Sequence, residues 1–202
     1  MTRISKPPQE RKKEILDTAL ELFLKNGYEN TSVGDIVSKL GVAQGLFYYY
    51  FKSKDEVYRA AMEQYTDDFA AQLASIVLEP TTLIDKIEKI LKIMSDMIAE
   101  SEHANMDGFR LAEHIDMDNR LSLHVAQTLI EPVTNMLEEM NNKGIIKIEN
   151  TEATAIFLVY GIFGLLHGNQ EHLQSIIVFD PKGVVLLASR VLGVTREELM
   201  QI

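Results

Sequence analysis

The chain has no cysteine among its 202 residues. This absence excludes disulfide bonds and thiolate metal ligands, and it is typical of proteins in a reducing compartment. The first residues of the chain are polar and basic, so they lack the apolar stretch of a secretory signal peptide. We therefore expect a cytoplasmic protein.

Long hydrophobic runs are also missing. The longest apolar run covers residues 153–166, which is shorter than the roughly 17 to 25 residues that a membrane-spanning helix needs. No basic residues flank this run as an interfacial anchor. The run therefore predicts a buried core or interface helix, and we expect no contact with a membrane.

Motifs of enzymes are absent as well. The sequence contains no GxSxG or HExxH motif, no phosphate-binding loop and no dinucleotide fingerprint. His114, Asp116, Asp118 and His124 are of the types that bind divalent metals, but their spacing matches no metal motif. A solvated helix edge explains these four residues equally well. We expect neither an enzyme nor a bound cofactor or metal.

Positive charge is scarce in the whole chain but is unevenly distributed. The formal net charge is −10, yet residues 1–62 carry 10 Lys+Arg against 8 Asp+Glu, while residues 63–202 carry 10 against 22. Only the first segment has a charge balance that suits contact with phosphates. The acidic remainder would repel DNA, so we expect it to face away from any nucleic acid.

Strand-like alternation and internal repeats are absent, whereas apolar residues recur at helical spacing throughout the chain. The sequence therefore predicts an all-α fold. Start and stop signals place nine helices at about residues 8–26, 33–40, 43–50, 54–78, 83–98, 105–112, 121–142, 151–170 and 181–192.

Residues 26–56 carry the pattern of a helix-turn-helix. Ser32 and Asp35 have the spacing of a capping box at the start of the first helix, and Gly41 ends that helix after about two turns. The second helix is short, and Phe47 and Phe51 are its expected core anchors. Such a unit offers its second helix to the DNA major groove.

The positions between these anchors give the DNA-binding candidates. A glutamine pairs with adenine, a glycine allows close backbone approach, tyrosine hydroxyls suit phosphates or base edges, and a capped helix start binds phosphate. Four consecutive aromatics spread over about 300° of a helix, so some of them must be exposed. The alternative is an aromatic core seam beside a solvated lysine. The candidates are Ser32, Gln44, Gly45, Leu46, Tyr48, Tyr49 and Lys54.

This segment resembles the tetracycline-repressor (TetR) family of bacterial regulators. The residues that carry the resemblance are Phe23, Gly27, Tyr28, Thr31, Ser32, Asp35, Ile36, Gly41, Val42, residues 45–51, Lys52, Lys54, Asp55 and Glu56. Two positions depart from the pattern: Ala43 stands where a capping serine is frequent, and Leu46 stands where a threonine or serine commonly touches phosphate. Each departure removes a possible hydrogen bond.

The resemblance implies a three-helix DNA-binding domain at residues 1–53 and a helical ligand-binding and dimerisation domain at residues 54–202. It also implies a repressor that is released from a palindromic operator by a small-molecule effector. A dimeric helical ligand-binding or adaptor protein without operator binding is the alternative function.

Thioethers and aromatic rings commonly line apolar pockets, so the effector site is expected between the helices at 54–78 and 151–170. The same residues could also serve as plain core. Such an interior favours a hydrophobic effector. The ligand-binding candidates are Met94, Met97, Phe109, Met136, Met140, Phe157 and Tyr160.

Three glycines lie on one face of the most apolar helix: Gly161, Gly164 and Gly168. Each interior glycine costs a helix about 1 kcal/mol relative to alanine, and close approach of another helix would offset that cost. The resemblance implies a four-helix dimer interface formed by the helices at 151–170 and 181–192. Tight packing inside one subunit is the alternative explanation.

Overall fold

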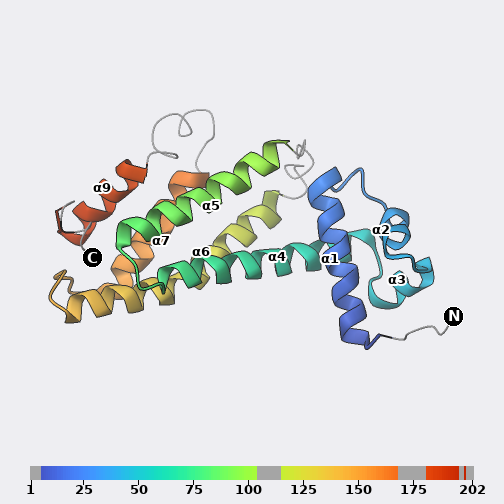
Figure 1. Cartoon of the computed structure of the whole chain (residues 1–202), viewed down its shortest axis with the longest axis horizontal. Helices are drawn as coiled ribbons and strands as arrows, with labels where there is room; N and C mark the ends of the chain where they lie inside the picture. The colour runs from blue at the N-terminus through green and yellow to red at the C-terminus, as the bar shows by residue number, and fades with distance from the viewer. Residues whose placement is uncertain (1–5, 104–114, 168–180, 196–197, 199–202) are drawn as a thin grey trace. The chain divides into compact units, whose positions relative to one another are not determined.

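The computed structural model describes residues 6–103, 115–167, 181–195 and 198. Every regular element in these ranges is an α-helix (Figure 1), which confirms the predicted all-α fold. The predicted short helix at residues 105–112 lies outside the described residues. In chain order the helices are α1 Pro8–Asn26, α2 Val33–Leu40, α3 Gln44–Tyr50, α4 Lys54–Val77, α5 Leu83–His103, α6 Ile115–Asn142, α7 Thr151–His167 and α9 Pro181–Leu192.

The chain divides into two compact units. The first takes the described residues of Met1–Asp67 and Ala99–Asp118, and the second takes those of Asp68–Ile98 and Asn119–Ile202. The division therefore falls inside α4, whereas the family resemblance implies a domain boundary between residues 53 and 54. The start of α4 belongs to the first unit because Val57 and Tyr58 there are fully inaccessible to solvent.

α1 illustrates how local sequence sets helix ends in the first unit. It begins at Pro8, where the missing N–H of proline costs no helical hydrogen bond. It ends before Gly27, whose φ of 81° favours glycine and whose N–H donates to the carbonyl oxygen of Phe23 at 2.9 Å. Ile15, Ala19 and Phe23 form its buried stripe, at the four-residue spacing of one helix face.

The second unit is built around two hydrophobic clusters to which α6 contributes heavily. One cluster consists of Leu83, Leu137, Met140, Ile146, Ala155, Val185 and Leu192. The other consists of Ala70, Leu73, Val125, Ala126, Leu129, Val159 and Phe163. Val133 packs against both clusters. α4, α5, α7 and α9 thus bury their apolar faces against a shared helix.

Polar contacts fix the turns of this unit. The side chain of Asn141 accepts from the N–H of Ile148 at 2.9 Å and donates to the carbonyl of the same residue at 3.1 Å. Lys86 Nζ donates to the carbonyl oxygen of Val77 at 2.7 Å and so caps the last residue of α4. A cation at this position complements the negative end of the helix dipole.

Among the helices of the described residues, none combines the length and the apolar character that crossing a bilayer requires. The apolar run at residues 153–166 forms most of α7, which packs against α9.

Leu137 and Leu123 provide a matched test of the α6 core. Leu137 is fully buried, whereas Leu123 on the same helix is 46% exposed. We expect Leu137→Ala to lower the free energy of unfolding by about 2 to 5 kcal/mol, because it removes buried atoms and leaves a cavity. Leu123→Ala should cost less than about 1 kcal/mol. Denaturant titration at one protein concentration measures both, and equal losses would contradict the core assignment.

Candidate nucleic-acid interface

The N-terminus of α2 is fixed by the capping box that the sequence predicts. Ser32 Oγ donates to Asp35 Oδ2 at 2.6 Å and accepts from the N–H of Asp35 at 3.1 Å, while the N–H of Ser32 donates to Oδ2 at 2.8 Å. These hydrogen bonds hold the pKa of Asp35 below its ordinary value, and the Lys54 ammonium acts in the same direction. α2 therefore starts at a defined residue.

A tight turn connects α2 to α3. Gly41 adopts the left-handed conformation with φ 65° and ψ 35°, and the N–H of Val42 donates to the carbonyl of Val37 at 3.0 Å. Ala43 precedes α3 in an extended conformation and offers no side-chain cap, as its departure from the family pattern predicts. α1 packs on α2, and α2 packs on α3.

α3 is anchored by two phenylalanines. Phe47 is 0% exposed and Phe51 is 2% exposed, and their rings lie 5.9 Å apart between centroids. Phe47 lies within α3, and Phe51 directly follows the helix in an extended conformation, with its N–H donating to the carbonyl oxygen of Phe47 at 2.9 Å. The seven-residue helix is too short to be stable by itself, so this burial holds it against the domain.

The opposite face of α3 carries most of the predicted DNA contacts. Gln44 and Gly45 are exposed, Leu46 is half-buried, and Tyr48 and Tyr49 are 51% and 76% exposed. No other atom lies within 4 Å of a Cβ added at Gly45, so the fold itself does not require a glycine there. The structure thus brings five of the seven candidates together on one short helix.

The two remaining candidates already have partners in the protein. The Ser32 hydroxyl is engaged by Asp35, although Ser32 itself is exposed. Lys54 Nζ lies 4.0 Å from the centroid of the Tyr28 ring and 3.5 Å from the carbonyl oxygen of Glu29. Desolvation lowers the pKa of Lys54, against the opposing effect of the Glu29 and Asp35 carboxylates.

Lys54 begins a helix whose cap largely follows the sequence prediction. Ser53 Oγ accepts from the N–H of Glu56 at 3.1 Å. The carboxylate of Glu56 accepts from the N–H of Lys52 at 2.6 Å, one residue before the expected partner in a capping box. The hydrogen bonds of Ser53 and Glu56 together therefore fix the start of α4.

Sequence reasoning missed two residues that support the interface. Thr31 is fully buried, and its hydroxyl oxygen lies 2.9 Å from the carbonyl oxygen of Gly27 and 3.2 Å from that of Leu22. Tyr28 forms the ring under the Lys54 ammonium. The only signal for either residue was its place in the family pattern, because both partnerships depend on the turn after α1.

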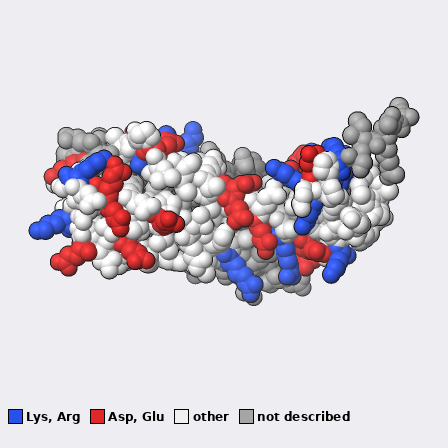
Figure 2. Space-filling model, turned by 90° about the horizontal axis from the view of Figure 1, so that it is seen from below, with Lys and Arg blue, Asp and Glu red and all other residues white. Residues whose placement is uncertain are grey.

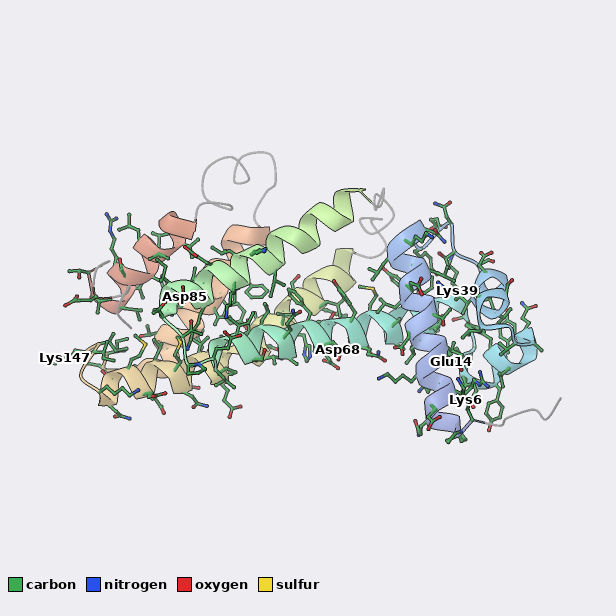
Figure 3. All side chains as sticks on the ribbon, in the orientation of Figure 1. Lys6, Glu14, Lys39, Asp68, Asp85 and Lys147 are labelled. Carbon is green, nitrogen blue, oxygen red and sulfur yellow. The ribbon has the colours of Figure 1, made fainter. Side chains whose placement is uncertain are left out.

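Several charges on the first unit form local ion pairs. Lys6 contacts Glu14 at 2.7 Å (Figure 3). Arg11 contacts the same carboxylate at 2.5 Å, and Lys39 pairs with Glu21. On the face seen in Figure 2, basic and acidic side chains are interspersed rather than gathered in one basic patch.

The candidates for the effector site are dispersed in the second unit. Met140 is 6% exposed within the first core cluster, and Met136 is half-buried beside it. Tyr160 is half-buried against the other cluster, while Phe157 is 64% exposed. Phe109 lies outside the described residues, and the side chains of Met94 and Met97 do too.

The dimer candidates Gly161 and Gly164 are exposed on α7, and a Cβ added at either meets no atom of a neighbouring element among the described residues within 4 Å. Gly168 lies outside the described residues. As for metals, the described part of the chain holds no group of three or more His, Asp or Glu residues placed to bind an ion. His114 falls outside that part.

Comparison with known proteins identifies the first unit. Residues 15–61 match the family model described as bacterial regulatory proteins, tetR family. The HTH-type transcriptional regulator YuxN of Bacillus subtilis is 30% identical over 105 residues, which cover 52% of this chain and 35% of YuxN. The fatty acid metabolism regulator protein of B. subtilis is 28% identical over 86 residues, covering 43% and 44%.

Other relatives align over nearly the whole chain. YvkB of B. subtilis, an HTH-type transcriptional regulator, is 27% identical over 90% of this chain and 94% of its own length. A transcriptional regulator from Cytophaga hutchinsonii superimposes with a TM-score of 0.59 at 17% identity, covering 94% and 97%. The fatty acid degradation regulator FadR of Bacillus halodurans gives 0.55 at 19% identity, covering 93% and 96%.

The first unit has the three features of a helix-turn-helix: a capped α2, a glycine turn, and an α3 that is buried on one face and exposed on the other. These features define a protein of the DNA-binding class. Residues 15–61 thus carry the region that the tetR-family model describes, and the relatives matched along the chain are named as transcriptional or metabolic regulators.

Phe47 and Tyr49 lie two residues apart on α3 but have different expected roles. Phe47 anchors the helix in the core, and Tyr49 contacts DNA. We expect Phe47→Ala to lower the free energy of unfolding by about 3 to 5 kcal/mol, because its ring is fully buried. Tyr49→Ala should cost less than about 1 kcal/mol but should weaken DNA binding, because its ring faces solvent. Thermal unfolding and fluorescence anisotropy with duplex DNA measure the two effects. Unchanged DNA affinity in Tyr49→Ala would remove this residue from the interface.

Proposed function

We propose that this protein is a homodimeric repressor, not an enzyme, that acts in the cytoplasm and binds a palindromic operator in the DNA major groove. A small hydrophobic effector in the second unit releases it. The proposed DNA binding rests on the two different faces of α3. Phe47 is fully buried, while the neighbouring Tyr48 and Tyr49 are 51% and 76% exposed. Exposed aromatics beside a polar side chain suit a binding surface.

Each exposed residue of α3 has a definite chemical role in this proposal. Gln44 forms a bidentate pair with adenine, and the hydroxyls of Tyr48 and Tyr49 donate to phosphate oxygens. Leu46 offers an apolar contact that suits the methyl group of thymine. Gly45 lets the backbone of α3 approach the bases, since a Cβ added there meets no described atom beyond its chain neighbours and its own helix backbone within 4 Å.

The dimer surface in this proposal is formed by α7 and α9. Both helices expose large apolar side chains, namely Ile156, Phe157, Leu186, Leu187 and Val191. Gly161 and Gly164 follow Phe157 at intervals of four and three residues, on the same face of α7. Since an added Cβ at either glycine meets nothing within the described subunit, approach by a second subunit is the favoured explanation for them. Phe157 therefore belongs with the dimer surface rather than with the effector site.

The proposed effector site lies in the interior around α6 and α7. Met136 and Tyr160 are half-buried beside the two core clusters, and the thioether and the ring suit an apolar ligand. Two similar proteins are named as regulators of fatty acid metabolism or degradation. These names support a hydrophobic effector for this chain.

In this proposal, α4 transmits effector binding in the second unit to the DNA-binding helices. It is one helix of 24 residues, about 36 Å long at 1.5 Å per residue. Residues 54–67 belong to the first unit and residues 68–77 to the second. In a dimer, a small shift of α4 would change the match between the two recognition helices and adjacent major grooves.

Operator binding and release can be tested with one selected duplex. The wild-type protein should enrich a palindromic sequence from a random duplex pool, and Gln44→Ala should lose about 1 to 3 kcal/mol of discrimination at one base pair of it. Failure to enrich any duplex would favour the ligand-binding or adaptor alternative.

Calorimetry with long-chain fatty acids as the first probes tests release. Because coupling is reciprocal, an effector that weakens operator binding must bind more weakly to the operator complex by the same factor. A fatty acid that binds equally tightly with and without operator is not the effector.

Gly164→Leu tests the dimer surface. We expect it to shift the protein to monomers at low micromolar concentration, because the monomer has room for the side chain and a close helix partner does not. Glu138→Leu, which places the same side chain at an exposed position of α6, should remain dimeric. Sedimentation velocity measures both, with circular dichroism as the check on folding. A dimeric, folded Gly164→Leu protein would rule out this surface.

A further inference from the structure

The ammonium group of Lys54 is held by two partners within the first unit. Its Nζ lies 4.0 Å from the centroid of the Tyr28 ring, within the about 6 Å range of a cation–π interaction. It also donates to the carbonyl oxygen of Glu29 at 3.5 Å. Both partners lie in the turn between α1 and α2, whereas Lys54 is the first residue of α4. Tertiary packing therefore confines an ammonium group that would otherwise move on a flexible stem.

The ring that receives this ammonium is itself fixed. Tyr28 stacks on Phe23 at 5.8 Å between centroids and meets Tyr58 edge-on at 4.7 Å. Phe23 and Tyr58 are fully buried and contact each other at 5.1 Å. Tyr58 follows Lys54 by four residues, so both side chains leave α4 on one face. The Tyr28 ring is therefore a rigid support for the ammonium group.

These two contacts leave the ammonium group able to bind a further partner. An ammonium group carries three N–H donors, and the carbonyl oxygen of Glu29 accepts from one of them. Lys54 is only half-buried, so solvent reaches part of its side chain. Desolvation lowers the pKa of Lys54, which means that the ammonium has already lost part of its hydration. A phosphate oxygen can therefore be accepted by a donor that is partly stripped of water.

The ammonium group also lies close to the start of α2. The carboxylates of Glu29 and Asp35 both act on it electrostatically, and that of Asp35 is engaged by the N-cap residue Ser32. Ser32 is exposed, and the first N–H groups of a helix favour phosphate because they lack partners within the helix. A phosphate bound at this helix start would lie near the Lys54 ammonium as well.

We propose that Tyr28 is a positioning residue for DNA binding, whose ring holds the Lys54 ammonium in place to bind a phosphate of the operator backbone. This inference rests on the proposed operator binding and on the sequence expectation that Lys54 meets a phosphate. The lysine is then oriented before DNA arrives. A side chain that is already ordered loses less conformational entropy on binding than a mobile one does. Tyr28 therefore raises DNA affinity without touching DNA itself.

A double-mutant cycle separates this role from a purely structural one. We expect Tyr28→Leu to weaken binding of the duplex selected by the wild-type protein about 2- to 13-fold, the fold-change that corresponds to ordering one flexible side chain. In a Lys54→Met background, Tyr28→Leu should cause no further loss of affinity, because no ammonium group remains to be held. Equal losses in the two backgrounds would mean that Tyr28 only supports the fold, and would overturn the proposal.

Salt titration of full-length variants checks that Lys54 is the group that is held. Lys54→Met should lower the slope of log K against log salt concentration by about one unit, because one phosphate contact is lost. Arg59→Met removes a positive charge of the same helix that pairs with Asp55, and it should leave the slope unchanged. Tyr28→Phe, which keeps a ring under the ammonium, should retain wild-type affinity. Equal slopes in the Lys54→Met and Arg59→Met proteins would overturn the proposal, as would a Tyr28→Phe protein that binds as weakly as Tyr28→Leu.

An NMR measurement on the wild-type protein gives an answer that does not depend on how the variants fold. The ring current of Tyr28 should shift the Lys54 ε-methylene protons upfield in the free protein, and this shift should persist in the DNA complex. Its absence from the free protein, or its loss on addition of the duplex, would overturn the proposal. A wild-type protein that enriches no duplex would end the proposed function and this inference together, whereas equal losses in the cycle or a missing ring-current shift would end this inference alone.

Discussion

The arrangement of the DNA-binding unit depends on burial of Phe47 in α3 and of Phe51 directly after it. Seven residues cannot sustain a helix in water, and Ala43 gives this helix no side-chain cap. Phe47 and Phe51 provide the stability that local sequence does not, because both rings are almost completely removed from solvent. Once these anchors face inward, helical geometry turns Tyr48 and Tyr49 outward. The exposure of these two tyrosines is therefore a consequence of how the core packs.

A second aromatic cluster ties the start of α4 to the same unit. Phe23, Tyr28 and Tyr58 come from three segments of the chain, and their rings are mutually in contact. The compact unit therefore extends to Asp67 rather than ending before α4. Because packed interiors resist continuous deformation, the start of α4 cannot move without moving the core of this unit. The regulatory role proposed for α4 rests on this shared core.

The second unit combines a shared central helix with an uncovered apolar surface. α6 contributes to both core clusters, so α5, α7 and α9 have a common partner. α7 and α9 still expose five large apolar side chains, and open glycines lie beside them. Residues 63–202 carry 10 Lys+Arg against 22 Asp+Glu, so we expect this acidic part of the chain to face away from DNA. The proposed dimer surface is apolar, whereas the proposed DNA-binding face of α3 carries polar and aromatic side chains.

Local sequence by itself determined the helices and their ends. Pro8, the Ser32–Asp35 capping box and Gly41 act within a few residues of chain, so their effects could be predicted and were confirmed. The inward anchors of α3 followed from four-residue spacing for the same reason. The partner of Lys54 could not be predicted, because Tyr28 is brought to it only by the packing of α1 against the start of α4. The exposure of Phe157 was also decided by tertiary structure. α7 is apolar on every side, so its sequence carries no periodicity that separates the face packed on α6 and α9 from the face left open.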